Sequence, residues 1–205
     1  MRELRILDET LRMGQQALWA TRMRTKWMLP IAPVMDRAGF YQVAAMAPVS
    51  FETAAMYLHE NPWERLRLLR RHMPGTSFDF LVRSRNVVGW FPKSNDVVEL
   101  FLKTLAATGI QGIKVFDGLN DYRNVEWHIR VGRQLGFHVK ALLDFAVSPV
   151  HTDEYFAAKA HELERLGVHA IVIADPCGSL LPERAASIVG MIRAELPGME
   201  LHLSS

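Results

Sequence analysis

Apolar and β-branched residues gather in seven short runs along the chain. Successive runs begin about 27 to 36 residues apart, the length of a strand, a helix and two loops. Several runs lack polar alternation, which is typical of parallel strands that are buried on both faces. We expect strands at Leu4–Leu7, Tyr41–Met46, Phe78–Val82, Ile113–Phe116, Val139–Val147, Ala170–Ile173 and Leu201–Leu203.

The segments between these runs carry the spacing of amphipathic helices. Apolar residues recur at helical intervals in Asn95–Ala107. Thr152–Leu166 begins with an N-cap threonine followed by acidic residues, and Pro182–Leu196 begins with a proline. Pro30 and Pro33 interrupt the first helical stretch, so we expect a kink or two short helices there.

This alternation predicts an α/β fold on a parallel sheet, either a (β/α)₈ TIM-like barrel or a doubly wound sheet. A barrel needs eight strands and about 250 residues, whereas this chain has 205 residues and its seventh run reaches the last residues. We therefore expect one incomplete, barrel-like domain over residues 1–205 that lacks a C-terminal strand and helix. An open edge would expose unpaired backbone groups, which proteins usually cover. Either another copy of the chain covers it, or the chain is a fragment, or the seven strands close on themselves; we favour self-association.

The composition is typical of an ordered globular protein. Hydrophobic residues make up 49% of the chain and the formal net charge is +2, so we expect neither disorder nor nucleic-acid binding. No apolar run is long enough to span a membrane. Cys177 is the single cysteine, which excludes an internal disulfide and fits a cytoplasmic location. Histidines in helical stretches, including His128, are expected at the surface.

Polar residues gather at the C-terminal ends of the expected strands, where parallel α/β proteins build their sites. The informative stretches are Asp8–Arg22, Val82–Gly89, Val115–Asp121, Ser148–Thr152 and Ile173–Gly178. Together and in this order they resemble the carboxyltransferase domain of the pyruvate carboxylase family. That family includes oxaloacetate decarboxylase alpha chains and the transcarboxylase central subunit, within a superfamily of hydroxymethylglutaryl-CoA lyase-like barrels. The resemblance covers essentially the whole chain.

The resemblance implies a divalent metal, but the sequence departs from the family at its ligands. Met13 stands where the family has an aspartate, and Ala174 stands where it has a carbamylated lysine. A thioether is a poor ligand for a hard or borderline ion. For the family's His-x-His pair, two alignments stay open. Either His202 is the first ligand and Ser204 replaces the second, or Ser204 replaces the first. We expect no bound metal, with His202 as the one remaining candidate ligand.

The anion-binding positions of the family persist. By the resemblance, Arg12, Gln16 and Arg83 contact a 2-oxo acid and act in catalysis, and Asp117 and Asp175 join them in binding substrate. An arginine fork fits a carboxylate, and a glutamine can hydrogen-bond a carbonyl. The residues alone also allow a structural ion pair of Arg12 with Asp8 or Asp117, and a local capping role for Gln16.

Two functions stay open at this point. In the family, carboxybiotin on a partner domain releases carbon dioxide, which the enolate of a 2-oxo acid takes up with help from the metal. The resemblance therefore implies a carboxyltransferase or carbon–carbon lyase acting on pyruvate, oxaloacetate or a similar acyl donor. We expect it to be metal-independent here, with a biotin carrier protein as partner and no cofactor bound to this chain. The alternative is a catalytically silent relative that serves in ligand sensing or subunit assembly.

Overall fold

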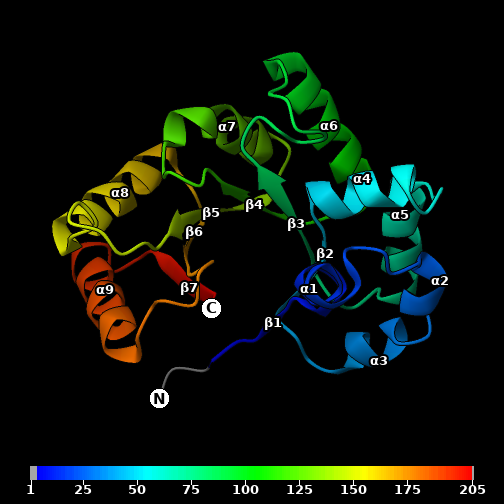
Figure 1. Cartoon of the computed structure of the whole chain (residues 1–205), viewed down its shortest axis with the longest axis horizontal. Helices are drawn as coiled ribbons and strands as arrows, with labels where there is room; N and C mark the ends of the chain where they lie inside the picture. The colour runs from blue at the N-terminus through cyan, green and yellow to red at the C-terminus, as the bar shows by residue number, and fades with distance from the viewer. Residues whose placement is uncertain (1–3, 205) are drawn as a thin grey trace.

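The computed structural model describes residues 4–204, and within them seven parallel strands form one sheet. The strand order β1-β2-β3-β4-β5-β6-β7 follows the chain. A doubly wound sheet reverses its order at a switch point, so this order is that of a barrel. Figure 1 shows the sheet curving at the centre with the helices around its outside. The prediction of an incomplete barrel-like fold is confirmed.

The elements alternate along the chain as the apolar pattern indicates. The strands are β1 (Leu7–Asp8), β2 (Gln42–Met46), β3 (Phe78–Arg83), β4 (Gly112–Phe116), β5 (His138–Asp144), β6 (Ala170–Ala174) and β7 (Glu200–Ser204). The α-helices are α1 (Gln15–Trp19), α2 (Thr25–Met28), α3 (Ala32–Arg37), α4 (Pro48–Met56), α5 (Pro62–His72), α6 (Asn95–Ala107), α7 (Glu126–Gln134), α8 (Asp153–Leu166) and α9 (Pro182–Glu195). A π-helical turn, η1 (Thr10–Gly14), and a 3₁₀ turn, η2 (Tyr122–Asn124), complete the list.

The two ends of the sheet are unpaired on their outer sides. Among the described residues, β1 pairs with β2 alone and β7 pairs with β6 alone. β1 is shorter than the expected Leu4–Leu7 run, and Leu4 and Ile6 are exposed. With a partner strand on one side only, little of this segment is held in the sheet. The strand expected to reach Val147 also ends earlier, at Asp144, where the chain leaves the sheet.

Short-range signals in the sequence predict local features well. The region of Pro30 and Pro33 forms two short helices, α2 and α3, which is one of the two expected outcomes. Thr152 caps α8, because its side-chain oxygen accepts a hydrogen bond from the Tyr155 N–H at 3.3 Å.

In the part of the chain that the structure describes, no helix combines the length and the apolar character needed to cross a bilayer.

The hydrophobic core lies between the sheet and the helices. Phe78, Phe80 and Val82 of β3 are fully buried in it, as are Ala141 and Leu143 of β5. Because successive side chains on a strand point to opposite faces, the residues between them point into the curve of the sheet. The interior of the incomplete barrel is therefore lined by a different, more polar set of side chains.

Candidate functional site

A network of buried charges fills the interior at the middle of the strands. Lys140 of β5 and Asp79 of β3 are fully buried and form an ion pair, with 3.1 Å between Nζ and Oδ2. Lys114 of β4 lies 3.6 Å from the same Asp79 oxygen and also pairs with Glu9, which follows β1. Lys140 donates a further hydrogen bond to the side-chain carbonyl of Gln42 in β2. Residues from five consecutive strands or their ends therefore meet in one network.

Burial makes this network energetically important. Removal from water lowers the pKa of Lys140, while the Asp79 carboxylate opposes that change. A buried charge is tolerated when an opposite charge and hydrogen bonds compensate for the lost water. The signal for these residues is present in the sequence, because Lys114 and Lys140 each lie inside an otherwise apolar run. Neither lysine was among the site residues expected from the sequence.

Gly112 of β4 leaves room for this network. A Cβ atom at this position would lie 2.6 Å from Gln42 Nε2 and 3.0 Å from Asp79 Oδ1. We expect Gly112→Ala to lower the free energy of unfolding by about 1 kcal/mol, because overpacking strains a filled interior. A matched control is Gly190→Ala in α9, where a Cβ atom meets nothing within 4 Å. That change should instead raise the free energy of unfolding by about 0.5 kcal/mol. Urea denaturation of both variants measures the difference, and a gain in both would contradict the crowding at Gly112.

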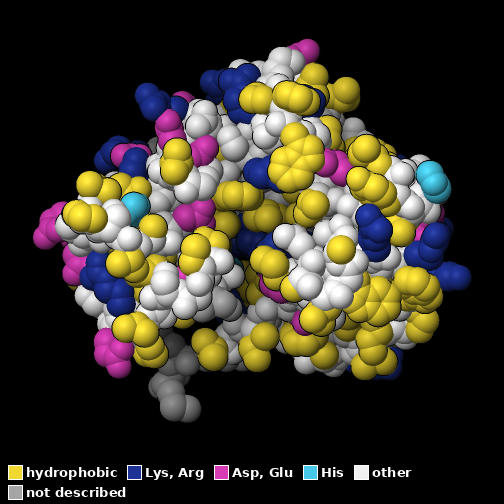
Figure 2. All heavy atoms as spheres, in the orientation of Figure 1, with side chains coloured by type: hydrophobic (Ala, Val, Ile, Leu, Met, Phe, Trp, Pro, Cys, Tyr) yellow, Lys and Arg dark blue, Asp and Glu magenta, His cyan; other side chains and the backbone are white. Residues whose placement is uncertain are grey.

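A second layer of inward-facing residues lies at the C-terminal ends of the strands. The strand register pairs Arg83 with Phe116, and it pairs Asp144 with Ala174 and Ala174 with Ser204. Residues paired in this way share a face of the sheet. Figure 2 shows the corresponding face of the molecule, with basic side chains deep in its centre and apolar side chains around them.

Asp144 is the residue of this layer with a strongly perturbed acidity. Burial, and secondarily the negative charge of Asp117, raise the pKa of Asp144 to about 6. Asn120 fixes the backbone at this point, because its side chain accepts from the Asp144 N–H at 2.8 Å and donates to the Asp144 carbonyl at 2.9 Å. A carboxyl group that holds a proton close to neutral pH is a candidate for proton transfer. Asp144 was not among the site residues expected from the sequence.

Arg12 and Gln16 lie on the first turns after β1. Arg12, on η1, is buried, and its Nε lies 2.8 Å from Glu9 Oε2. Its positive charge is thus already paired, with a glutamate in place of the aspartate we considered. Gln16 is exposed on α1, whereas its neighbour Gln15 is buried and donates to the Leu11 carbonyl. The capping role considered for Gln16 is thus carried by Gln15.

Arg83 lies at the end of β3 beside the following loop. Its Nη2 donates to the Gly89 carbonyl at 3.2 Å and lies 4.0 Å from Glu52 Oε1. The guanidinium carbon is 4.5 Å from the centre of the Trp90 ring, a cation–π contact. Glu52 also accepts a hydrogen bond from the Gly89 N–H at 2.6 Å. Because the ion pair with Glu52 is long, the Arg83 charge is only partly neutralised.

Asp117 and Asp175 organise the loops in which they lie. Asp117 accepts hydrogen bonds from two backbone N–H groups of its own loop and from Asn124 Nδ2 at 3.0 Å. Asp175 accepts from the N–H groups of Leu180 and Ser179, at 2.8 and 3.0 Å. These backbone donors lower the pKa of Asp175. Their role in substrate binding stays a prediction.

The expected substrate-binding residues therefore come from separate loops. Arg12 joins the interior network through Glu9, whereas Arg83 belongs to a group with Glu52 and Trp90. That they bind one ligand together stays a prediction.

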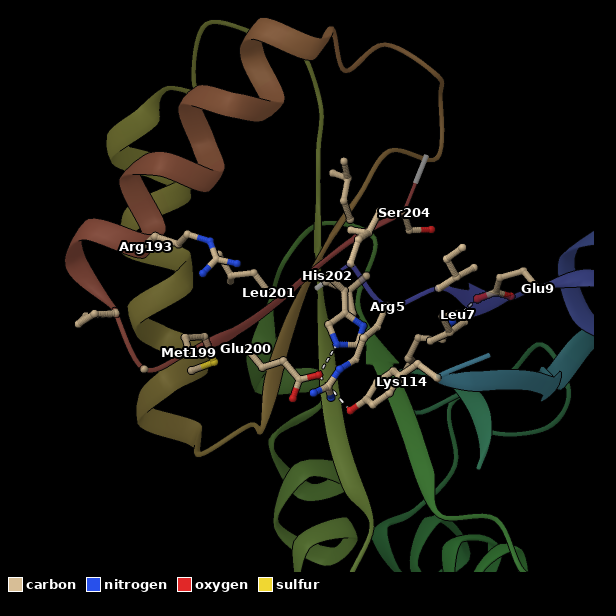
Figure 3. A pocket seen from close by; sticks show the side chains of 17 residues that line it. Arg5, Leu7, Glu9, Lys114, Arg193, Met199, Glu200, Leu201, His202 and Ser204 are labelled. Atoms are coloured by element: carbon tan, nitrogen blue, oxygen red, sulfur yellow. Dashed lines mark hydrogen bonds and ion pairs between the residues drawn. The ribbon is translucent and has the colours of Figure 1, made fainter. Parts of the chain in front are cut away.

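A cavity of about 900 Å³ lies along the unpaired edges of β1 and β7 (Figure 3). Lys114 and Glu9 of the interior network form part of its wall. On β7, His202 Nε2 lies 2.7 Å from Glu200 Oε1, and Figure 3 shows both side chains turned toward Arg5. The cavity therefore gives access to Glu9 and Lys114 of the interior network from the side of the barrel, between β1 and β7.

Several characterised proteins are similar to this chain over nearly its whole length. A pyruvate carboxylase subunit of Methanocaldococcus jannaschii is 38% identical over 193 residues, which are 94% of this chain and 34% of that protein. The methylmalonyl-CoA carboxyltransferase 5S subunit of Propionibacterium freudenreichii subsp. shermanii is 32% identical over 94% of this chain and 38% of that protein. No protein-family model matches the chain.

A solved structure is also similar to this chain over almost its whole length. The carboxyl transferase domain of Rhizobium etli pyruvate carboxylase, determined with pyruvate and biocytin, superimposes with a TM-score of 0.94 at 29% identity, covering 98% of this chain and 35% of that chain. The chain resembles the carboxyltransferase domain of pyruvate carboxylase. The resemblance seen in the sequence motifs is thus confirmed. The chain spans about a third of the length of these relatives.

By the resemblance to carboxyltransferases, Met13, Ala174 and β7 occupy the positions of the family's metal ligands. Met13, Ala174 and Ser204 offer a thioether, a methyl group and a hydroxyl group. Within residues 4–204, no group of three or more His, Cys, Asp or Glu side chains is placed to hold a metal ion. His202, the one candidate ligand, hydrogen-bonds Glu200. A thioether and a methyl group are poor ligands for magnesium, manganese or zinc, and the absence of a bound metal stays a prediction.

Proposed function

We propose that the chain binds the carboxylate of a small 2-oxo acid, such as pyruvate or oxaloacetate, at the C-terminal ends of its strands. We also propose that it takes part in biotin-dependent carboxyl transfer. The similarity to carboxyltransferases over almost the whole chain supports the reaction class. The observation that carries the proposal most directly is Arg83, a half-buried and only partly neutralised guanidinium at the end of β3.

The residues at the strand ends have distinct tasks in this proposal. The Arg83 fork takes the carboxylate of the 2-oxo acid, and the Trp90 ring covers one face of the guanidinium and limits access of water. In carboxyl transfer a base takes a proton from the carbon next to the keto group, a role for which Asp144 is the candidate. The enolate that forms takes up the carbon dioxide that carboxybiotin releases. A fixed cation in a partly dry site stabilises the negative charge of that enolate.

We further propose that substrate binding needs no divalent metal. The thioether of Met13 and the methyl group of Ala174 support this, since neither can replace a carboxylate or a carbamate on such an ion. Elemental analysis of the purified protein tests the point. One equivalent of zinc, manganese or magnesium per chain would contradict it.

A biotin carrier protein as partner and a cytoplasmic location belong to the same proposal. The Rhizobium etli carboxyl transferase domain, which was determined with pyruvate and biocytin, supports the carrier, and the single cysteine supports a reducing compartment.

Replacement of Arg83 tests the proposed binding site. We expect Arg83→Met to weaken pyruvate binding about tenfold, because a charge-assisted, two-pronged hydrogen bond is lost while the apolar stem of the side chain is kept. Arg67→Met on α5 is the control, because Arg67 is exposed and pairs only with Glu64 of its own helix, at 3.5 Å. Isothermal titration calorimetry with pyruvate and oxaloacetate measures both. Equal affinities for the two variants would disprove the role of Arg83, and a wild-type protein that binds neither acid would disprove the function.

The second candidate is a catalytically silent relative used for ligand sensing or assembly. The replaced metal ligands favour it, as does Arg12, whose charge is already paired with Glu9. A turnover assay with oxaloacetate and free biotin, followed by pyruvate formation, separates the two candidates. Binding of the 2-oxo acid without turnover would identify a sensing role.

The unpaired edges of β1 and β7 support self-association. Exposed strand edges offer free backbone donors and acceptors, which proteins usually cover. We therefore expect light scattering of the 205-residue chain to give at least twice the monomer mass of 23.3 kDa at micromolar concentration. A monomer that melts cooperatively would contradict this expectation.

A further inference from the structure

A small basic pocket lies away from the strand-end site, between the loop after β3 and the start of α7. It has a volume of about 270 Å³. Three arginines line it, Arg85 from the loop, Arg123 from η2 and Arg130 from α7, and Glu126 is the one carboxylate of its lining. Cations therefore outnumber anions around this pocket.

Two helices begin at the pocket. Asn95 and Glu126, the first residues of α6 and α7, both contribute to its lining. Figure 1 shows these two helices as neighbours on the outside of the sheet. The first N–H groups of a helix lack partners within the helix, and its dipole is positive at this end. Both helices thus add to the positive potential of the pocket.

Buried polar groups also face this pocket. His128 lines it and is 1% exposed, against our expectation of a surface position, because it packs under Ser84 and Arg85 of the loop. Among the described residues, Nε1 of Trp127, which also lines the pocket, has no hydrogen-bond partner, whereas the ring nitrogens of His128 have only the backbone groups of Ser84 and Val125 near them. Buried polar groups normally have a partner, so Trp127 Nε1 indicates a ligand.

The arginines are held in place by contacts that orient them. Arg85 Nε donates to the Lys93 carbonyl at 3.1 Å. The Arg130 guanidinium lies 4.1 Å from the centre of the Trp127 ring. Arg123 is paired with Asp121, which reduces its contribution. Arg85 and Arg130 are therefore the main cations available to an anion in the pocket.

We propose that this pocket binds a phosphate-sized dianion, either free inorganic phosphate or the phosphoryl group of a phosphomonoester. Arginine forks match the oxygens of phosphate, and helix N-termini are recurrent phosphate sites. Trp127 Nε1 supplies a neutral donor, and His128 supplies another. The proposal is independent of 2-oxo acid binding, because its residues differ from those at the strand ends.

Affinity measurements with two probes test the proposal. Inorganic phosphate and methyl phosphate are titrated separately into the wild-type protein by NMR, following the ring signals of His128, assigned with a His128→Asn variant. Binding of phosphate alone identifies the free ion, and binding of both identifies a phosphoryl group of a larger molecule. Either result supports the pocket. No response of His128 to either probe at about 10 mM would overturn it, since weak specific sites have dissociation constants near 1 mM.

Two variants distinguish a built site from general attraction. Arg85→Gln should weaken binding about tenfold, the loss expected for one charge-assisted contact. Arg165→Gln removes the same charge from an exposed position on α8 and should leave the affinity unchanged. Equal losses in both variants would overturn the proposal, because they would reflect net charge alone. Arg130→Gln is a second test of the same kind, should Arg85→Gln fold poorly.

The acidity of His128 provides a further readout. Burial, with a smaller contribution from Arg85, lowers the pKa of His128 to about 4, while backbone groups of Ser84 and Val125 oppose this. The other charged groups lining the pocket are Arg123, Arg130 and Glu126. Bound phosphate should raise the pKa of His128 by about one unit, because a nearby anion favours the charged ring. An unchanged pKa at saturating phosphate would place the anion elsewhere.

Discussion

Lys140→Met is expected to lower the free energy of unfolding by about 3 to 5 kcal/mol, the range found when one partner of a buried ion pair is removed. Methionine keeps the length and the apolar stem of lysine but carries no charge. Asp79 would then remain fully buried with Lys114, 3.6 Å away, as its one close cation. The side-chain carbonyl of Gln42 would also lose its donor. Urea denaturation followed by circular dichroism measures the change.

An exposed ion pair on α6 is the matched control for this experiment. Lys103 lies 2.7 Å from Glu99, and more than half of its side chain is exposed. Lys103→Met should change the free energy of unfolding by less than about 1 kcal/mol, because water already solvates both charges. If the two variants lose the same amount, the interior network does not contribute to stability through its buried charges.

Asp144→Asn is expected to stabilise the protein above pH 6 and to have no effect near pH 4. The pKa of Asp144 is raised to about 6 by burial and by Asp117, so the folded state favours the protonated form. In the unfolded chain the group ionises near pH 4. The favourable contribution of the protonated carboxyl is therefore present below pH 4, falls between pH 4 and 6, and is absent above. Asparagine cannot ionise, so the variant does not lose this stability as the pH rises. Above pH 6 its free energy of unfolding should therefore exceed that of the wild type by about 2 kcal/mol, after allowance for partial exposure.

Denaturation curves of wild type and variant at pH 3, 4, 5, 6 and 7.5 test this expectation. Asp121→Asn is the control with the opposite sign, because a side-chain hydrogen bond from Arg123 lowers the pKa of Asp121. Its carboxylate contributes stability above pH 4 that is lost as the pH falls. Parallel pH profiles for wild type and Asp144→Asn would show that Asp144 ionises normally in the folded protein.

Local sequence patterns predicted the fold, but they predicted only part of the candidate site. The spacing of apolar runs predicted seven strands, and the motifs after them resembled one family. Arg83 was selected by its place at the end of a strand. Asp144, Asp79 and Lys140 were not selected, because an isolated charge within an apolar run gives no information about which charge will oppose it. The burial of His128 under the loop after β3 was likewise absent from the helical pattern.

By itself the sequence determined the order of strands and helices and the position of the Thr152 cap. These depend on hydrophobic periodicity and residue chemistry, which act over a few neighbouring positions. The tertiary structure alone decided that Asp79 meets Lys140, and that Arg85 and His128 line one pocket. These residues lie far apart in the sequence, and only the curvature and register of the parallel sheet bring them within reach of electrostatic and hydrogen-bonding forces.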